Sequence, residues 1–211
     1  MNVFVIGANG QIGKQLVERL KQDGKHEVTA MVRKQEQLDE FKANGYQAVL
    51  GDLEGDVETL KQAMSGMDAV VFAAGSGGST GADKTLLIDL DGAAKSVEAA
   101  QANGNIKHFV MLSALKAEDR SAWPDSMKPY YVAKHHADRL LEQSGLDYTI
   151  VRPGALTDDA GTGKVNVDNV STGEIPRADV AAFLAHVIGR QEAANKAIDL
   201  VKGDTAIEET I

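Results

Sequence analysis

The chain has 211 residues, 43% hydrophobic and 25% charged, a balance typical of a folded domain with a sizeable core. Its 31 acidic and 22 basic residues give a formal net charge of −9, which argues against nucleic acid as a partner because an acidic surface repels phosphate backbones. The lack of cysteine excludes disulfides, thiolate catalysis and zinc–sulfur sites. Without a basic signal-peptide region or a long apolar run, we expect a cytoplasmic protein with no membrane contact.

Short apolar runs alternate with segments of helical period. The runs show no alternation with polar residues, which is typical of parallel strands covered on both faces; they lie at 3–6, 27–32, 47–50, 69–73, 107–112, 147–151 and 197–201. Glycines stand where helices should end, at Gly24, Gly104, Gly145 and Gly189. Four helical stripes lie between the runs: Ile12, Leu16 and Leu20; Leu86, Leu90, Ala94 and Val97; Ala133, Ala137, Leu140 and Leu141; and Val180, Phe183, Leu184 and Val187. The pattern predicts an α/β fold: a Rossmann-type doubly wound parallel sheet in three α/β/α layers, forming a single domain.

Two longer connections interrupt this rhythm, at residues 75–81 after the fourth predicted strand and at 115–129 after the fifth. Both leave the carboxyl ends of strands, where open α/β sheets bind ligands, so we expect them to border the ligand site. We treat residues 1–211 as one dinucleotide-binding domain whose last part, 155–211, forms a small substrate-side portion.

A glycine loop follows the first predicted strand and opens the first helix, with the sequence Gly7-Ala8-Asn9-Gly10-Gln11-Ile12-Gly13. Gly7 permits a tight turn, Gly10 lets the backbone approach a pyrophosphate, and Gly13 allows close packing of helix on strand. The amides of the helix N-terminus favour the bound phosphates. The loop therefore predicts a dinucleotide site that uses Gly7, Asn9, Gly10, Gln11 and Ile12.

The end of the second predicted strand indicates which dinucleotide binds. An NAD site places a carboxylate there, whereas this strand ends in Arg33-Lys34, which suits the 2′-phosphate of NADP. We expect NADP(H) to be preferred, with NAD(H) still possible. Further cofactor contacts are predicted at Asp52 and Leu53, beside the adenine, and where the small residues Ala73, Ala74 and Gly75 let the backbone pass close to a ribose.

Taken in order, several segments resemble the atypical short-chain dehydrogenase/reductases, in particular the NAD(P)H-binding branch of biliverdin-IXβ/flavin reductase-like and NmrA-like proteins. They are the glycine loop, Gly51-Asp52-Leu53, Ala73-Ala74-Gly75, 130–134 (Tyr-Tyr-Val-Ala-Lys), 147–154 (Asp-Tyr-Thr-Ile-Val-Arg-Pro-Gly) and 175–181. The resemblance spans nearly the whole chain, and its combination of segments is more specific than any one of them.

The resemblance implies a catalytic group of Ser113, Tyr130 and Lys134. Tyr130 would give a proton to a carbonyl oxygen as hydride arrives, and Ser113 would orient the substrate oxygen. Lys134 would hold the ribose and, by its positive charge, lower the pKa of the Tyr130 phenol toward neutrality. Tyr130 and Lys134 are four residues apart, so they share one helix face. The resemblance also places Pro153, Gly154 and Ala155 against the nicotinamide.

The implied function is that of an NADP(H)-dependent oxidoreductase acting on a small carbonyl, quinone-like or flavin-like acceptor. A non-catalytic NADP(H) sensor of the NmrA type is an alternative, in which Tyr130 merely packs beneath the long connection. A sugar-nucleotide epimerase or dehydratase is less favoured, because such enzymes usually carry a larger C-terminal substrate domain. His135 and His136 have no matching ligand cluster, so we expect no metal site; the sequence leaves monomer and homodimer open.

Overall fold

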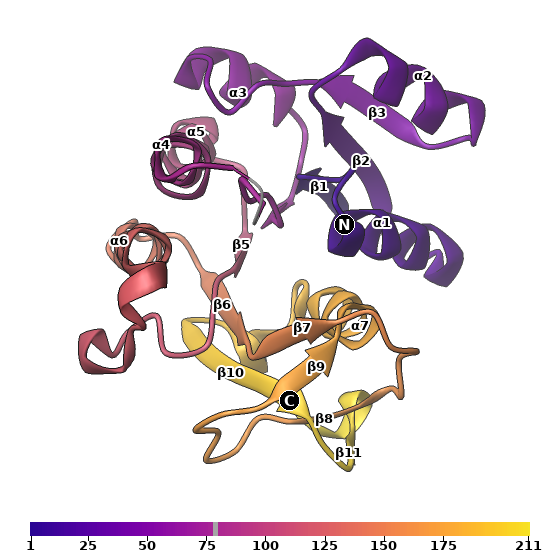
Figure 1. The fold of residues 1–211 in the computed structure, drawn as a ribbon. Coiled ribbons are helices and arrows are strands. Elements are labelled where there is room, and N and C mark those ends of the chain that lie inside the picture. Colours follow the sequence, from indigo (N-terminus) through magenta and orange to yellow (C-terminus); the bar gives the residue numbers. More distant parts are fainter. Residues whose placement is uncertain (78–79) are drawn as a thin grey trace.

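The computed structural model describes residues 1–77 and 80–211. Within these residues the chain forms a nine-stranded sheet in the order β11-β8-β10-β6-β5-β4-β1-β2-β3 (Figure 1). The strands of this sheet are β1 Asn2–Ile6, β2 Glu27–Val32, β3 Gln47–Leu50, β4 Ala69–Phe72, β5 His108–Leu112, β6 Tyr148–Pro153, β8 Lys164–Asn166, β10 Lys196–Lys202 and β11 Thr205–Ala206.

Every neighbouring pair from β3 through β10 is parallel. At the far edge β8 pairs antiparallel with β10, and β11 pairs antiparallel with β8. The central strands β4 and β5 are buried along their whole length, which explains their unbroken apolar runs. This sheet, with helices on both faces, confirms the predicted Rossmann-type α/β architecture.

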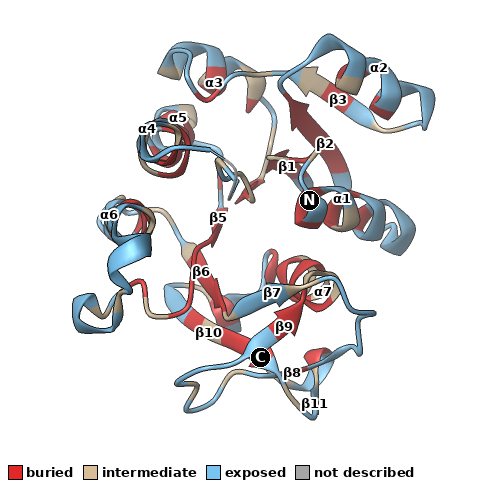
Figure 2. Cartoon of the chain, viewed as in Figure 1, coloured by how far each residue is buried: buried red, intermediate tan, exposed pale blue. Residues whose placement is uncertain are grey.

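Helices cover both faces of the sheet, and the side chains of β1 alternate between two cores (Figure 2). Val3 and Val5 pack with α1, α2 and α7, while Phe4 and Ile6 pack with α3, α5 and α6. The helices are α1 Gln11–Asp23, α2 Gln35–Ala43, α3 Val57–Ala63, α4 Ala82–Lys84, the π-helical segment η1 Thr85–Gly92, α5 Ala93–Asn103, α6 Lys128–Glu142 and α7 Arg177–Val187.

The predicted helix ends are confirmed. Gly24 and Gly104 adopt the left-handed conformation at the ends of α1 and α5, with φ of 65° and 71°. Gly145 and Gly189 have positive φ just beyond α6 and α7. Only glycine adopts this conformation without steric cost, so these positions end the helices.

The two predicted connections have different outcomes. Gly78 and Ser79 of the predicted 75–81 loop lie outside the described residues. The 115–129 connection contains two 3₁₀ turns, η2 Arg120–Ala122 and η3 Asp125–Met127, and α6 already begins at Lys128. Pro129 fits the first turn of α6 because the amide it lacks would have no partner inside the helix.

The last quarter of the chain completes the sheet rather than standing apart from it. Strand β10 pairs with β6, and α7 packs on α1 through Val180, Phe183 and Leu184. A small parallel pair, β7 Ala155–Thr157 and β9 Glu174–Pro176, lies beside it, and the 3₁₀ turns η4 Gln191–Ala193 and η5 Ile207–Glu209 lie near the C-terminus. The sequence analysis did not predict the short strands, because three residues show no periodicity.

Candidate functional site

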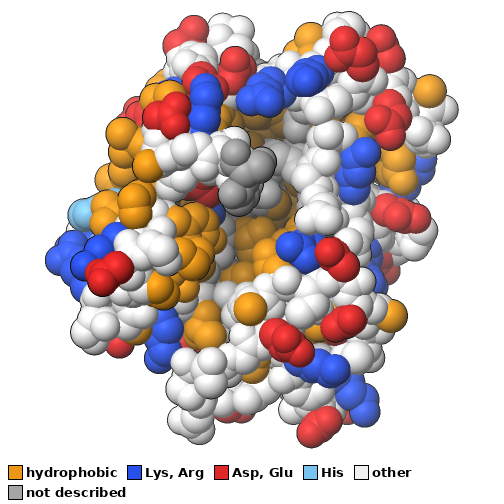
Figure 3. Space-filling model, in the orientation of Figure 1, with side chains coloured by type: hydrophobic (Ala, Val, Ile, Leu, Met, Phe, Trp, Pro, Cys, Tyr) orange, Lys and Arg blue, Asp and Glu red, His pale blue; other side chains and the backbone are white. Residues whose placement is uncertain are grey.

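The loops that follow β1, β4, β5 and β6 leave the sheet at its carboxyl edge, where ligands of open α/β sheets bind. Figure 3 shows a hollow between the N-terminal half and the C-terminal portion, with hydrophobic side chains on its floor and Lys and Arg side chains along one rim. The predicted cofactor and catalytic residues lie on these loops and on the elements that border them.

The glycine loop, residues 7–13, turns directly from β1 into α1. Gly7 has a φ of 82°, the amide of Gly10 donates to the carbonyl of Gly7 at 2.9 Å, and the amide of Lys14 donates to the carbonyl of Gly10 at 2.9 Å. Gly10 caps α1 without a side-chain acceptor, and no acidic residue lies in the first turn. The N-terminal amides of α1 therefore have no side-chain acceptor at the cap, and their partial positive charge suits an anion.

The three glycines of the loop have different surroundings. A Cβ at Gly7 would lie 2.6 Å from the Cα of Ala74, and a Cβ at Gly13 would collide with the carbonyl oxygen of Gly7. A Cβ at Gly10 would meet only the carbonyl oxygen of Gly7, at 3.2 Å. Gly7 and Gly13 are thus required by packing, whereas Gly10 borders the space that a ligand would occupy.

The remaining loop residues differ in exposure. Gln11 is exposed, Ile12 is buried in the core beneath α1, and the side-chain oxygen of Asn9 is buried without a hydrogen-bond partner among the described residues. A buried polar atom left without a partner is costly, so a ligand or water is expected there. Their contacts to a cofactor remain predictions.

Arg33 and Lys34 lie exposed immediately after β2, where the second strand of a Rossmann fold meets the adenosine ribose. Both backbone amides donate to Oε1 of Gln37, each at 3.1 Å, which fixes the turn into α2. Within the described part of the chain, no ion pair involves the Arg33 guanidinium. A bidentate donor is therefore available beside the predicted 2′-phosphate position.

Asp52 and Leu53 follow β3, but the structure gives them different environments. Asp52 is exposed and its Oδ1 accepts from the amide of Glu54 at 2.9 Å. Leu53 is buried, packed so closely that a Cβ at Gly92 would lie 3.0 Å from the Leu53 Cβ. Leu53 is thus part of the core beneath α5, and its predicted contact with adenine remains untested.

Ala73, Ala74 and Gly75 lead from β4 past the glycine loop. The backbone of Ala74 passes so close to Gly7 that a Cβ at Gly7 would collide with it, while the predicted approach of this segment to a ribose remains untested. The next residue, Ser76, donates its amide to Oδ2 of Asp89 at 2.9 Å. This segment is therefore fixed on one side by the glycine loop and on the other by η1.

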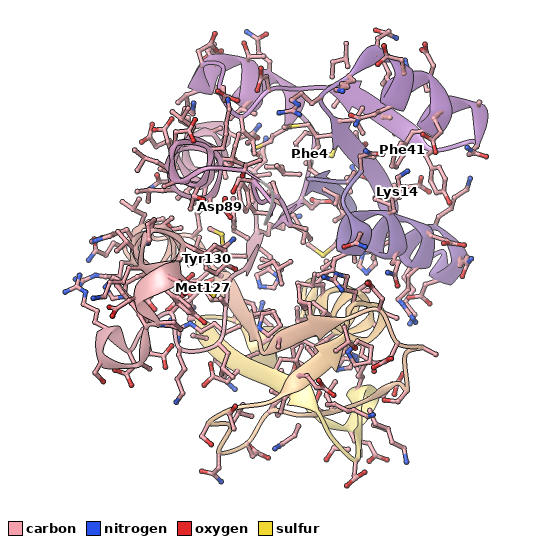
Figure 4. The ribbon with its side chains drawn as sticks, in the orientation of Figure 1. Phe4, Lys14, Phe41, Asp89, Met127 and Tyr130 are labelled. Carbon is pink, nitrogen blue, oxygen red and sulfur yellow. The ribbon has the colours of Figure 1, made fainter. Side chains whose placement is uncertain are left out.

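The structure brings Tyr130 and Lys134 together on the first turns of α6. The ammonium of Lys134 lies 5.7 Å from the centre of the Tyr130 ring. It donates to the carbonyl of Leu112 at 3.2 Å and forms an ion pair with Oδ1 of Asp89 at 3.2 Å. Figure 4 shows Asp89 and Tyr130 on neighbouring helices near the middle of the molecule.

Lys134 is almost completely buried, with a side chain that is 5% exposed. Burial lowers the pKa of Lys134, but Tyr130, Asp89 and Asp138 outweigh this effect and leave the pKa raised above its ordinary value. The lysine is therefore a cation held in place by carboxylates. The sequence analysis missed Asp89, although an acid inside the apolar stretch Leu86–Leu90 was a readable signal.

Ser113, directly after β5, is buried, and its hydroxyl has no partner of good geometry among the described residues. Burial raises the pKa of Asp138 on α6, while Arg152 and the Ser113 hydroxyl favour the charged form of this carboxyl. The Nε of Arg152 donates to Oδ2 of Asp138 at 2.9 Å, and Glu118 lies 3.2 Å from the same guanidinium. Ser113 thus lies beside a buried charge network that the sequence analysis did not find.

Pro153, Gly154 and Ala155 join β6 to β7 at the edge of the hollow. The amide of Gly154 donates to Leu200 and that of Ala155 to Gly173, each at 2.9 Å. A side chain at Gly154 would collide with the carbonyl of Gly173, so packing alone already requires this glycine. Ala155 is exposed and Pro153 buried; their contact with a nicotinamide remains a prediction.

The 115–127 connection is fixed to α6 by aromatic contacts. The indole of Trp123 donates to the carbonyl of Lys116 at 2.9 Å, stacks on Tyr131 at 6.0 Å and meets His135 edge-on at 5.5 Å. Nδ1 of His135 lies 2.9 Å from the carbonyl of Ala117. His135 therefore has a structural contact, and no group of three potential metal ligands occurs in residues 1–77 and 80–211.

Two shallow apolar hollows lie between η1 and α6. One is lined by Leu86, Leu87, Leu90, Asp91, Ala94, His136 and Leu140, and the other by Ala82, Leu86, Leu90, Lys128, Pro129, Val132 and Ala133. Neither touches the glycine loop. In the described parts of the chain, no helix combines the length and apolarity that a membrane crossing requires.

The residues present fit a nicotinamide dinucleotide. The glycine loop leaves a cradle at Gly10 that a side chain would narrow, the side-chain oxygen of Asn9 lacks a partner among the described residues, and the Gly10 cap of α1 offers no side-chain acceptor. These features meet at the end of β1, where the pyrophosphate of such a cofactor binds.

A family model described as NAD(P)H-binding matches residues 7–191, and the chain belongs to this family. The match confirms the resemblance to atypical short-chain dehydrogenase/reductases. Among solved structures, the oxidoreductase ylbE from Lactococcus lactis is 33% identical with a TM-score of 0.90, covering 99% of this chain and 94% of that one.

Two curated relatives carry different functional names. The chain is 52% identical to a Bacillus subtilis protein named an uncharacterized sugar epimerase, YhfK, over 100% of this chain and 99% of the relative. It is 27% identical to sanguinarine reductase from Eschscholzia californica, over 95% of this chain and 88% of the relative. The chain thus belongs to the NAD(P)H-binding family, whereas the names of these two relatives point to different reactions.

Proposed function

We propose that this protein is an NADP(H)-dependent reductase that transfers hydride to a small carbonyl, quinone-like or flavin-like acceptor. The observation that carries the proposal is the arrangement at the carboxyl edge of the sheet. The glycine loop leaves a phosphate cradle, and Lys134, beside Tyr130, is tied through Asp89 to the segment that crosses this loop. The names of ylbE and sanguinarine reductase support an oxidoreductase.

Each element of the site has a stated task. When bound, the reduced nicotinamide supplies the hydride. The amides of the glycine loop and the N-terminus of α1 hold the pyrophosphate. Lys134 holds a ribose hydroxyl and places its positive charge beside the Tyr130 ring. Tyr130 gives a proton from its hydroxyl to the acceptor oxygen. Ser113 orients that oxygen.

The preference for NADP(H) over NAD(H) rests on Arg33 and Lys34. An exposed guanidinium matches a 2′-phosphate with two parallel hydrogen bonds, which a ribose 2′-hydroxyl does not offer. We expect NADPH to raise the melting temperature of the protein more than NADH does. We expect Arg33→Ala to weaken the binding of NADPH far more than the binding of NADH. Arg19→Ala, which removes an exposed arginine from α1, is the control. Equal weakening of both cofactors would contradict the assignment.

The role of Tyr130 is tested by Tyr130→Phe with Tyr131→Phe as its matched control. Both variants lose one hydroxyl and keep the ring, and Tyr131 stacks on Trp123 rather than on Lys134. We expect Tyr130→Phe to lower kcat for carbonyl acceptors by about 10² to 10⁴, the usual contribution of a general acid. Normal turnover in Tyr130→Phe, with NADPH still bound, would mean that the acceptor is reduced without this acid.

Epimerisation of a sugar is the second candidate, because YhfK carries that name at 52% identity. An epimerase returns its nicotinamide to the starting oxidation state after each turnover, whereas a reductase consumes one reduced cofactor per product. Incubation with nucleotide sugars, read by product analysis and cofactor absorbance together, separates the two. Tight NADPH binding without turnover of either the carbonyl acceptors or the nucleotide sugars would favour the sensor alternative.

A further inference from the structure

An exposed apolar patch covers the outer surface of η1 and α6. In the part of the chain that the structure describes, eight large hydrophobic side chains are exposed, and four of them, Leu86, Leu87, Val132 and Leu140, lie on these two elements. Leu86 is 56% exposed, more than the other seven. Single exposed leucines are common on protein surfaces, whereas a contiguous group of them marks a contact with another surface.

The patch is continuous because the two elements lie side by side. Since η1 and α5 join β4 to β5 and α6 joins β5 to β6, these helices run in the same direction along the parallel sheet. The two apolar hollows between them share Leu86 and Leu90, and we call the surface lined by both hollows the η1/α6 face. Hydrophobic side chains gather along the left edge of Figure 3, over the helices that Figure 1 labels α4 and α6.

The charges on the η1/α6 face are few and of opposite sign. Apart from His136, the titratable residues among the described ones that line the hollows are Lys128 in one hollow and Asp91 in the other. Both lie at the surface, where Lys128 pairs with Asp125 and Asp91 with Lys95. The face therefore carries one charge of each sign, in a protein whose formal net charge is −9.

This chemistry suits a protein surface of the same kind. A small-molecule site encloses its ligand and surrounds it with several polar groups, whereas these hollows are shallow and mainly apolar. An anionic membrane would meet an acidic protein with a single lysine on this face. A second copy of the chain brings the same leucines and an opposite charge for each charge.

We propose that the η1/α6 face binds the η1/α6 face of a second copy of this chain across a two-fold axis. The axis passes between the hollows, beside Leu86 and Leu90, so that each hollow of one copy lies opposite the other hollow of its partner. The exposed leucines of the two copies then pack together, and Lys128 of one copy comes within reach of Asp91 of the other. The inference goes beyond the proposed function and does not depend on it.

The first test is the mass of the full-length protein, without cofactor, by sedimentation equilibrium. At about 100 µM protein we expect twice the mass of one chain. Leu86→Glu should sediment as a monomer, because a carboxylate buried in an apolar interface without a partner is costly. Leu50→Glu is the control and should remain a dimer, because Leu50 is 45% exposed on β3, outside the η1/α6 face. A parent protein of monomer mass, or a dimer that Leu86→Glu leaves intact, would overturn the proposal.

A charge exchange tests the axis and covers the case in which Leu86→Glu does not fold. Lys128→Glu and Asp91→Lys should each raise the Kd of the dimer at least about tenfold, because each variant places like charges opposite one another. The double variant Lys128→Glu/Asp91→Lys restores the opposite charges, and its Kd should return to within about threefold of the parent value. A double variant that dimerises no better than the two single variants would overturn the proposed arrangement.

Cofactor binding and vesicle binding separate this inference from the other readings. A dimer that binds no NADPH supports the inference and rejects the proposed cofactor. A monomer that oxidises NADPH with a carbonyl acceptor overturns the inference and leaves the reductase standing. A monomer that sediments with vesicles of neutral phosphatidylcholine also overturns it and assigns the η1/α6 face to a lipid surface.

Discussion

Gly10 and Gly13 are three residues apart, yet a side chain would meet very different neighbours at the two positions. At Gly13 a methyl group would collide with the carbonyl of Gly7, whereas at Gly10 it would lie 3.2 Å from that oxygen and otherwise point into open space. Gly13 is required by the contact of α1 with β1, whereas Gly10 is the position that we propose faces the cofactor. Adding one methyl group at Gly10 or at Gly13 can therefore separate an effect on cofactor binding from an effect on stability.

We expect Gly10→Ala to fold with nearly the parent stability and to bind NADPH at least tenfold more weakly, because the added methyl occupies the pyrophosphate position. Gly13→Ala should lose stability by about 1–3 kcal/mol, since the loop and helix must move apart. Urea unfolding and isothermal titration of NADPH measure the two effects. Equal cofactor affinity in Gly10→Ala and the parent would contradict the cradle.

His108 is a second residue whose surroundings predict a measurement. The amide of Gly189 donates to its Nδ1 at 3.0 Å, and its Nε2 lies 2.9 Å from the hydroxyl of Thr149, which donates to the carbonyl of Ala193. Burial lowers the pKa of His108 below its ordinary value of 6.5, while Asp147 acts weakly in the other direction. The folded protein thus holds a neutral ring that links β5, β6 and the end of α7.

A lowered pKa makes the unfolded chain bind a proton more readily than the folded one. The stabilisation from His108 is therefore complete above pH 6.5 and is lost as the pH falls from 6.5 through the lower pKa of the folded state. We expect His108→Gln to be less stable than the parent at pH about 7.5, with a smaller difference at about 5.5. The quantity to follow is the difference in stability between the parent and His108→Gln at each pH. The parent alone is not enough, because the pKa values of His26, His136 and His186 are lowered as well. A constant difference at both pH values would contradict this account.

Among the elements, α6 has two tasks. Its first turns carry Tyr130 and Lys134, and its next turn carries Asp138, whose ion pair with Arg152 fixes the helix to β6. The pair is almost fully buried, with side chains 2% and 10% exposed. Removal of one partner leaves the other charge buried without compensation, so the pair matters to the position of the whole helix.

We expect Asp138→Ala to lower the free energy of unfolding by about 3–5 kcal/mol. The double variant Asp138→Leu/Arg152→Met should be more stable than this single variant, because it leaves no buried charge unpaired; Glu118 and Glu142, which also approach Arg152, are partly exposed to water. Asp125→Ala is the control: its ion pair with Lys128 lies on the surface, with Asp125 93% exposed, and should contribute less than about 1 kcal/mol. Denaturant unfolding of the four proteins gives the comparison, and similar losses in Asp138→Ala and Asp125→Ala would refute it.

The accuracy of sequence-based prediction varied by element for physical reasons. The buried strands and the helix-ending glycines were predictable because continuous apolar runs and left-handed turns leave direct marks in a sequence. Helices α2 and α3 were missed because they bury few side chains, Leu38 and Phe41 in one and Leu60 in the other. The short strands β7, β8, β9 and β11 are held by pairing with distant segments, which local patterns do not record.

At the scale of the whole molecule, the hollow of Figure 3 is bordered by segments from across the chain, and a bound cofactor would join them. A ligand that binds only the folded state stabilises it by about 2.7 kcal/mol at a concentration 100-fold above Kd. For a domain of this size we expect a rise in Tm of about 5–10 °C with NADPH. Gly10→Ala at the same concentration is the control, and no rise in the parent protein would contradict the proposed cofactor.

The candidate site was predictable only in part, because a linear pattern names residues but not their partners. The glycine loop, Tyr130 and Lys134 follow spacings that can be read from the chain. Asp89 and Arg152 act through contacts with residues far away in sequence, and each looks like an isolated charge within an apolar stretch. Charge within a predicted core segment is the signal that would have found both.

The packing of α7 on α1 has a consequence for how the protein is made. Helix α1, the proposed pyrophosphate site, emerges early from the ribosome. The apolar face of α1 that packs against α7 through Val180, Phe183 and Leu184 stays uncovered until α7 has been synthesised. A nascent chain stalled before residue 177 should therefore expose this face to chaperones and fail to retain NADPH. Once the rest of the chain has been synthesised, burial of the face and retention of NADPH should appear together.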